Sequence, residues 1–148
     1  MSTKLPYVKT VTKRRIAVTQ MRRAILLYRE GDFICSLTLA GAAEEILGKM
    51  VAQRGHSSAL DDFATRDRKL WEWAAKREPR LTVPPNAELR RRLNCLRNDL
   101  KHNDSGTDKR VVAIFDYSAE EMLLRCIRNY LKLYGKPPRD KVIADWLA

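Results

Sequence analysis

LAGAAEE, residues 39–45, is the stretch that decides the fold of this chain. Apolar residues recur around it at steps of three and four, which predicts a helix over residues 33–53, and Asp32 stands just before its start. The small residues at its centre let a neighbouring helix approach closely. Glycine costs a helix about 1 kcal/mol relative to alanine, so Gly41 is expected to have a packing reason.

The same helical period continues through most of the chain. It predicts a helix over residues 14–30 and another over residues 58–78, whose inner side is formed by Leu60, Phe63, Ala64, Leu70, Trp71 and Ala74. A fourth helix is capped by Asn86 and ends near HNDSGTD, residues 102–108, because this run is rich in turn formers.

The C-terminal third predicts two more helices. Ser118 and Glu121 have the spacing of a capping box that opens a long helix, and Gly135 ends it. A short helix follows, which docks through Val142, Ile143 and Trp146. The segment VVAIF, residues 111–115, is the one β-like run and is expected to be extended coil packed on the bundle. The fold class is therefore all-α, a four- to five-helix bundle that is more than half helical.

Composition favours one folded domain. The chain has 148 residues, of which 45% are hydrophobic and 32% charged. We expect a basic N-terminal segment, residues 1–13, followed by a single helical domain, residues 14–148. No apolar run is long enough to span a bilayer, and the first fifteen residues lack the apolar stretch of a signal peptide. Three widely spaced cysteines, Cys35, Cys95 and Cys126, indicate small core residues in a reducing, cytoplasmic compartment.

The net charge of +11 favours a polyanionic partner. Positive charge is concentrated early, since eight basic residues precede the first acid, Glu30. Solubility alone explains many basic proteins, but a nucleic acid is the favoured partner. The candidate contacts with RNA are Arg14, Arg15, Arg90, Arg91 and Lys101.

The stretch RRRLNCLRNDLKHNDSG, residues 90–106, carries the candidate chemistry. On a helical wheel, one arc faces the core and contains Leu89, Leu93, Leu96 and Leu100. The opposite side contains Arg91, Asn94, Asn98 and His102, with Arg97 between the two. The spacing of Arg97 and His102 proves little alone, because the chain is rich in arginine. A histidine in the last turn can also simply cap free carbonyls.

The wider pattern resembles the HEPN superfamily of small all-α domains, over roughly residues 14–135. DFICSLTLAGAAEEILG, residues 32–48, is similar to its second helix, and LRNDLKH, residues 96–102, is similar to its signature of Arg, a polar residue, three or more others and His. FDYSAEEMLLRCIRNYLKL, residues 115–133, is similar to the final helix of a bacterial branch.

The resemblance implies a metal-independent endoribonuclease, often a toxin or defence effector, that acts as a dimer with two signature helices meeting at one cleft. The catalytic roles fall on Arg97, Asn98 and His102. Some toxin branches have a tyrosine two places after the histidine, where this chain has Asp104. Other family members are non-catalytic nucleotide or RNA binders, or partners of a nucleotidyltransferase. An antitoxin or a nucleotidyltransferase is therefore a possible partner beside RNA and a second copy.

These residue types also suit RNA cleavage without reference to a family. RNA supplies its own nucleophile, the 2′-OH. Histidine can take or give a proton at neutral pH, and arginine offers a fixed fork to charge that develops on phosphate. No cofactor and no metal ligand set are expected. Glu44 or Glu45 could brace the arginines of this helix, although surface exposure is as good an interpretation for one of the two.

Three other residues have a structural interpretation that is favoured over a functional one. His56 lies in an expected loop with no triad or ligand set nearby. Trp71 and Trp73 could stack on bases, but Trp71 fits the core side of its helix and Trp73 the surface. The leading hypothesis is therefore a ribonuclease, and the alternative is a non-catalytic HEPN-like module that binds RNA, a nucleotide or a protein partner.

Overall fold

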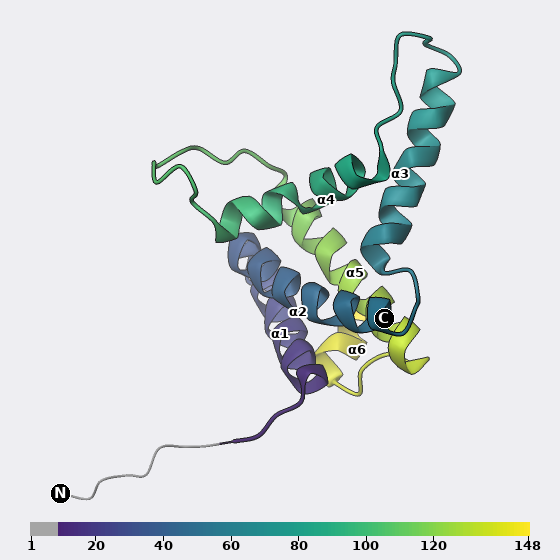
Figure 1. Ribbon diagram of the computed structural model, residues 1–148. Coiled ribbons are helices and arrows are strands. Elements are labelled where there is room, and N and C mark those ends of the chain that lie inside the picture. Colours follow the sequence, from purple (N-terminus) through teal and green to yellow (C-terminus); the bar gives the residue numbers. More distant parts are fainter. Residues whose placement is uncertain (1–8) are drawn as a thin grey trace, which may run out of the picture.

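The protein is all-α. The computed structural model describes residues 9–148, and this part of the chain contains six helices and no strand (Figure 1). They are α1 (Lys13–Arg29), α2 (Phe33–Gln53), α3 (Ala59–Ala75), α4 (Asn86–Lys101), α5 (Phe115–Tyr134) and α6 (Lys141–Leu147). The all-α prediction is confirmed, and the helices lie close to their expected bounds. Of the expected N-terminal segment, residues 1–8 lie outside the described residues.

Side-chain caps begin four of the helices. The side chains of Thr12, Asp32 and Asp140 accept hydrogen bonds from the first turns of α1, α2 and α6. Ser58 opens α3 with a reciprocal capping box formed with Asp61. These caps satisfy backbone N–H groups that have no partner within a helix, and they therefore fix where each helix starts.

The starts of α4 and α5 differ from expectation. Pro85 occupies the cap position of α4 without a side-chain bond, and Asn86 is instead the first helical residue. Helix α5 begins at Phe115, so Ser118 lies inside it and forms no capping box. Phe115, the first residue of α5, is half-buried, and this burial favours a helix start earlier than the predicted cap. The end of α5 was predicted correctly, because Gly135 adopts the left-handed conformation with φ of 70°.

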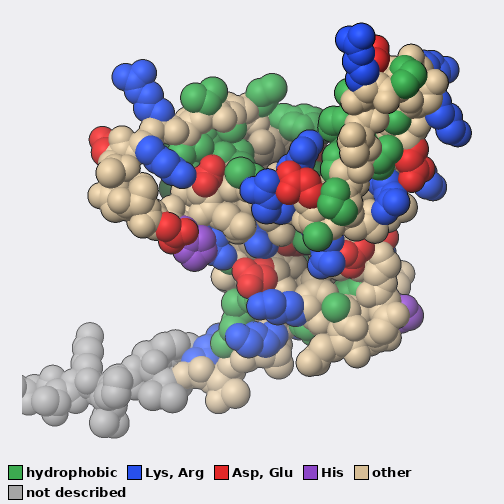
Figure 2. All heavy atoms as spheres, turned by 45° about the horizontal axis from the view of Figure 1, so that its top comes forward, with side chains coloured by type: hydrophobic (Ala, Val, Ile, Leu, Met, Phe, Trp, Pro, Cys, Tyr) green, Lys and Arg blue, Asp and Glu red, His purple; other side chains and the backbone are tan. Residues whose placement is uncertain are grey.

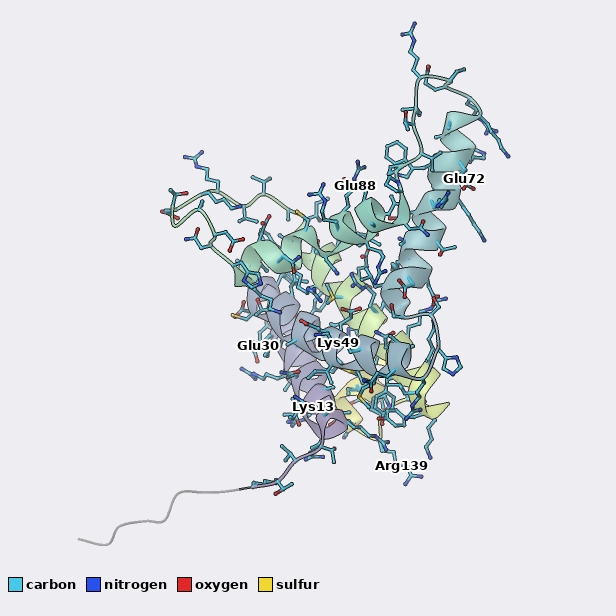
Figure 3. The ribbon with its side chains drawn as sticks, viewed as in Figure 1. Lys13, Glu30, Lys49, Glu72, Glu88 and Arg139 are labelled. Carbon is cyan, nitrogen blue, oxygen red and sulfur yellow. The ribbon has the colours of Figure 1, made fainter. Side chains whose placement is uncertain are left out.

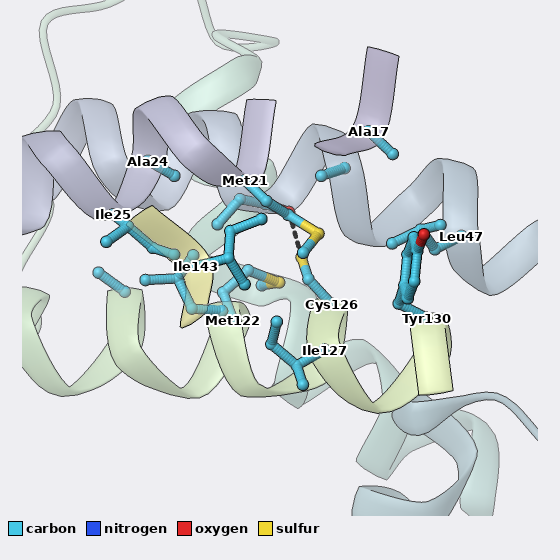
Figure 4. Close-up of a cluster of buried hydrophobic side chains, with 14 of the residues drawn as sticks. Ala17, Met21, Ala24, Ile25, Leu47, Met122, Cys126, Ile127, Tyr130 and Ile143 are labelled. Carbon is cyan, nitrogen blue, oxygen red and sulfur yellow. Dashed lines mark hydrogen bonds between the residues drawn. The ribbon is translucent and has the colours of Figure 1, made fainter. Parts of the chain in front are cut away.

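The core lies where α2 packs between α1 and α5. It is aliphatic, with Met21, Ile25, Leu37, Leu47 and Leu123 almost fully buried (Figure 4). Cys126 on α5 donates its thiol hydrogen to the carbonyl oxygen of Ala40 on α2, at 3.1 Å. This close contact is possible because α2 presents small residues there. Burial, reinforced by the nearby charge of Glu44, raises the pKa of this thiol well above its ordinary value.

Only one of the three cysteines is a core residue. Cys126 is buried, but Cys35 and Cys95 are exposed, so the expectation that all three fill the core was wrong. Cys35 lies in the first turn of α2 and Cys95 on the outer side of α4. Within residues 9–148, no helix has both the length and the apolar character needed to cross a membrane.

Helix α3 leaves the bundle and projects beside α4 (Figure 1). Phe63 and Ala64 near its start are buried, whereas Leu70 is 61% exposed and Trp73 57% exposed. The inner side expected for this helix therefore holds only over its first half. Trp71 is half-buried and Trp73 lies on the surface, as predicted. The guanidinium of Arg77 lies 3.8 Å from the centre of the Trp73 ring.

The segment that links α4 to α5 packs on the bundle only through alternate residues, because Val111 and Ala113 are partly buried and their neighbours are not, so the packing predicted for it holds in part. Val112 is 93% exposed and Ile114 is 72% exposed. Tyr117, in the first turn of α5, is also exposed. On the face shown in Figure 2, hydrophobic side chains gather along the upper edge, while basic and acidic side chains alternate across the centre. The molecule thus leaves an apolar surface uncovered next to the end of α4.

Helix α6 closes the core at the side of α1. Ile143 is fully buried, and Val142 and Trp146 pack partly against the same cluster, as predicted.

We expect Ile143→Ala to lower the free energy of unfolding by about 2–5 kcal/mol, because the truncation leaves a cavity. Guanidinium denaturation monitored by circular dichroism measures the loss. Leu147→Ala, in the same helix but 42% exposed, is the control and should cost less than about 1 kcal/mol. Equal losses would contradict the docking of α6.

Candidate functional site

A buried ionic cluster joins α2, α4 and α5. The carboxylate of Glu44 on α2 lies between two guanidinium groups, with one oxygen 3.3 Å from Nη1 of Arg97 and the other 3.1 Å from Nη2 of Arg125. The side chains of Glu44, Arg97 and Arg125 are 4%, 12% and 0% exposed. Two cations therefore share one anion in the protein interior, and the cluster keeps an excess of one positive charge.

Arg125 connects this cluster to the backbone of α4. Its Nη1 donates to the carbonyl oxygen of Leu93 at 3.3 Å, and its Nη2 donates to Oδ1 of Asn94 at 2.8 Å. Asn94 was expected on the outer side of its helix, but it is half-buried and faces Arg125. The outward prediction for Asn94 was wrong because the wheel takes no account of a buried cation on a neighbouring helix.

Gly41 explains how Arg97 enters the bundle. A Cβ atom placed on Gly41 would lie 2.7 Å from both Cγ and Cδ of Arg97, closer than packed atoms tolerate. The missing side chain therefore makes room for the aliphatic part of Arg97. This is the packing reason that the sequence led us to expect. The helical wheel predicted Arg97 between the core side and the solvent side of its helix. In the structure its side chain points inward and contacts Glu44.

Glu45, the neighbour of Glu44, braces the end of α4 from outside. It accepts hydrogen bonds from Lys49 at 2.9 Å and from Lys101 at 3.3 Å. The bond from Lys49 above all, together with Lys101, holds the pKa of Glu45 down at about 2 despite its partial burial. Glu44 and Glu45 thus contact α4 at two points, a buried one at Arg97 and a surface one at Lys101.

Asn98 and His102 are exposed at the C-terminal end of α4. His102 follows the last helical residue, has an extended backbone with φ of −124°, and donates its backbone N–H to the carbonyl oxygen of Asn98 at 2.9 Å. The helix ends where it was expected to end. Nη2 of Arg97 reaches Oδ1 of Asn98 over a long 3.4 Å, so Asn98 is the contact between the buried arginine and the exposed end.

One chain places Arg97 and His102 in separate hollows. Arg97 lines a cavity of about 240 Å³ between α2, α3 and α4, together with Glu44, Glu45, Asp61 and Arg90. His102 lines a second cavity of about 240 Å³ between the end of α4 and the segment that follows. Within residues 9–148, no hydrogen bond joins the two side chains. The three predicted catalytic residues are therefore neighbours in the fold without forming one closed site.

Most of the predicted RNA contacts are already paired with acids. Arg90 lies 3.3 Å from Asp61, Arg91 lies 2.8 Å from Glu88, and Lys101 contacts Glu45. The hydrogen bonds from Arg91 and then Arg92 lower the pKa of Glu88 to about 2. Arg14 and Arg15 lie at the start of α1, away from α4. The predicted contacts therefore do not form one continuous surface.

Two residues of this region were not expected to take part. Arg125 and Asn94 complete the ionic cluster, yet Arg125 looks like one of many surface arginines in the sequence. Its position on α5 between Met122, Cys126 and Asn129, which are all buried, was the available signal, because the period of the helix places it toward the inside.

Comparison of the chain with family models, with curated proteins and with solved structures found no match. Among residues 9–148, no group of three His, Cys, Asp or Glu side chains is arranged to hold a metal ion. His56 is exposed in the loop between α2 and α3.

The ionic cluster should respond sharply to loss of its single anion. We expect Glu44→Gln to lower the free energy of unfolding by about 3–5 kcal/mol, because it leaves two buried guanidinium groups without a counter-ion. Glu45→Gln is the matched control, since its partners lie at the surface, and it should cost about 1 kcal/mol or less. Urea denaturation at neutral pH measures both. Similar losses in the two variants would contradict the central position given to Glu44.

Proposed function

We propose that the protein is a metal-independent endoribonuclease of the HEPN type, a helical bundle that works as a homodimer. The observation that carries the proposal is the end of α4, where exposed Asn98 and His102 stand beside an arginine fixed by a buried carboxylate. The resemblance of residues 96–102 to the family signature supports the same proposal. RNA is the substrate class, because its own 2′-OH can act as the nucleophile without a metal.

The chemistry assigned to His102 is proton transfer. The 2′-oxygen attacks the adjacent phosphorus as its proton moves to one imidazole, and the bond to the 5′-oxygen breaks as that oxygen takes a proton from a second imidazolium. The products are a 2′,3′-cyclic phosphate and a free 5′-hydroxyl. One chain offers a single histidine at this place, since His56 lies in a different loop. Two copies would supply both proton carriers.

Arg97 and Asn98 would act on the phosphate. The excess positive charge of the Glu44 cluster lies behind Asn98, where it would favour the negative charge that develops on the phosphorane. Nε of Arg97 has no hydrogen-bond partner within the described chain, and its bond to Asn98 is long. Asn98 is exposed and can hydrogen-bond a phosphate oxygen or orient the imidazole.

The uncovered apolar segment supports a second copy at this end of the molecule. Val112 and Ile114 are exposed within twelve residues of His102 along the chain, and Tyr117, in the first turn of α5, is exposed as well. Apolar side chains exposed in sequence in this way indicate a surface that a partner covers. A two-fold contact here would bring two copies of the end of α4 toward one cleft.

The second candidate function is a non-catalytic RNA-binding module. The observation in its favour is that Arg97 is paired with Glu44 and only 12% exposed, so it is poorly placed to reach substrate in one chain. Asp99 and Asp108 line the hollow that contains His102 together with Lys101 and Lys109, so its lining has no excess of positive charge to attract a phosphate. Asp104, where some toxin branches have tyrosine, lies exposed in the same loop.

Association can be tested through the apolar segment. We expect the wild type to be a dimer at roughly tens of micromolar, and the double variant Val112→Asp with Ile114→Asp to be a monomer, because two charges cannot be buried in an apolar contact. Light scattering after size-exclusion chromatography gives the mass of each. Leu147→Asp, which adds one charge at an exposed leucine of α6, should remain a dimer. A monomeric wild type would contradict the proposed dimer.

Catalysis is tested with structured RNA in the presence of a chelator. Wild-type protein should leave 2′,3′-cyclic phosphate ends, and His102→Ala should lower the cleavage rate by about 10²–10⁴-fold through loss of a proton-transfer group. His102 is exposed at the end of its helix, so this variant should unfold at nearly the wild-type temperature. His56→Ala is the control and should cut normally.

The two candidate functions separate in the same experiment. Cleavage that fails only in the His102 variant supports the ribonuclease. RNA binding by wild type and variant alike, with no cleavage by either, supports the non-catalytic module. Full activity in the His102 variant would overturn the assignment of that residue. Arg97→Ala is a less direct test, because it also removes a partner of the buried Glu44.

A further inference from the structure

A hollow lined by arginines lies at the start of α1, away from the end of α4 (Figure 1). Its volume is about 230 Å³, and its polar lining comes from Thr12, Arg14, Arg15, Tyr130 and Arg139. Among residues 9–148, no acidic side chain lines it. Figure 3 shows Lys13, the first residue of α1, and Arg139 at the same lower end of the molecule.

Arg14 is held rigidly in this hollow. Its Nε and Nη2 donate to the hydroxyl oxygen of Tyr130, at 2.9 and 2.6 Å. Its guanidinium also lies 4.1 Å from the centre of the Tyr134 ring, within the range of a cation–π contact. These contacts leave the Nη1 hydrogens of Arg14 available. A guanidinium fixed in this way loses little conformational freedom when it binds an anion.

The positive charge of the hollow is not neutralised by the described chain. Within residues 9–148, no carboxylate lies within ion-pair distance of Arg14, Arg15 or Arg139. Arg90 and Arg97, by contrast, pair with Asp61 and Glu44. Asp140, next to Arg139 in the sequence, caps α6 and contacts Arg22 instead.

The sequence at the start of α1 opposes the helix dipole. The first turn consists of Lys13, Arg14 and Arg15 and contains no acid. Cations are disfavoured at a helix N-terminus, where the backbone N–H groups already create positive potential. Thr12 caps the N–H of Arg15, which leaves the N–H groups at the very start of the helix without an intrahelical partner. An anion would remove the conflict.

The Tyr130 hydroxyl gives an independent indication of a ligand. Tyr130 is 1% exposed, and its hydroxyl oxygen accepts both bonds from Arg14. Among residues 9–148, no acceptor receives the hydrogen of this hydroxyl. A buried O–H without an acceptor costs free energy unless something else satisfies it. The hollow into which this side chain faces is the place from which an acceptor could come.

We propose that this hollow binds a phosphate group. A phosphate offers several oxygens, which can accept from Arg15, Arg139 and the remaining hydrogens of Arg14 together with the Tyr130 hydroxyl. A terminal phosphate carries up to two negative charges, whereas a carboxylate carries one. The larger charge suits a hollow that contains three guanidinium groups. Backbone N–H groups at the start of α1 add donors of the kind that bind phosphate in other helical sites. The site uses none of Arg97, Asn98 and His102, so it stands apart from the ribonuclease proposal.

Titration with inorganic phosphate tests the site directly. Amide chemical shifts of Lys13 and Arg14 report local binding, and calorimetry gives the Kd. The double variant Arg15→Gln with Arg139→Gln should weaken phosphate binding at least about tenfold, because two charge-assisted donors are lost. Both side chains are exposed, so the fold should be kept. Tyr130→Phe, which removes only the hydroxyl, should weaken binding as well.

Arg29→Gln is the control for loss of a surface arginine. Arg29 is an exposed arginine at the other end of the same helix, so this variant changes the net charge without touching the hollow. It should bind phosphate as tightly as the wild type does. The proposal is overturned if the wild type shows no saturable phosphate binding, or if the double variant and the Arg29 variant lose equal affinity.

The source of the phosphate is distinguished with three probes. These are inorganic phosphate and a 2′-O-methyl oligoribonucleotide with either a 5′-phosphate or a 5′-hydroxyl, which the ribonuclease chemistry cannot cut. If the double variant weakens only the 5′-phosphorylated strand and free phosphate, the site binds a terminal phosphate. If it weakens both strands equally, the site contacts internal phosphodiesters. If it weakens free phosphate alone, the ligand is a small phosphate compound. Unchanged binding of all three probes overturns the site, whatever the cleavage assay shows.

Discussion

The position of α4 depends on one buried carboxylate. Glu44 on α2 holds Arg97 on α4 and Arg125 on α5, so a single side chain sets how three helices meet. An ion pair in the interior is weak evidence for high stability, because desolvation offsets much of the attraction. Its directional contacts do exclude other registers, since a one-residue rotation of α4 would move Arg97 away from Glu44 and Asn94 away from Arg125. The cluster therefore specifies geometry, and the aliphatic core around Leu37, Leu47 and Leu123 supplies most of the stabilisation.

The parts of this fold that were predicted well are those governed by local chemistry. Asp32 and Gly135 mark helix ends through their own hydrogen bonds and backbone freedom, so the bounds of α2 and the end of α5 follow from a few neighbouring residues. The errors arise where distant segments decide. Arg97 turns inward because Gly41, more than fifty residues earlier, leaves space for it, and a helical wheel contains no information about that gap. The exposure of Leu70 likewise reflects how far α3 extends beyond its neighbours.

For the candidate site, the sequence predicted which residues gather better than it predicted which of them are buried. Asn98 and His102 do lie together at an exposed helix end, as a spacing of four residues requires. Arg97 instead belongs to the interior, where it links the exposed end to Glu44 and Arg125. The positive charge of Arg97 can act on a nearby anion through the low-dielectric interior while Arg97 stays paired with Glu44. This arrangement fits an arginine that positions and polarises better than one that reaches out to grip a phosphate.

The net charge of +11 is informative only after the ion pairs are assigned. Arg90, Arg91 and Lys101 each face a carboxylate, so their attraction for a polyanion is largely cancelled at close range. Arg14, Arg15 and Arg139 have no such partner within the described chain and lie together around one hollow. These three charges at the start of α1 would attract a long anion such as RNA, whereas the chemistry proposed for His102 lies at the end of α4. A substrate that satisfies both must extend between these two places, so the two sites would favour a polymer over a small phosphate ester.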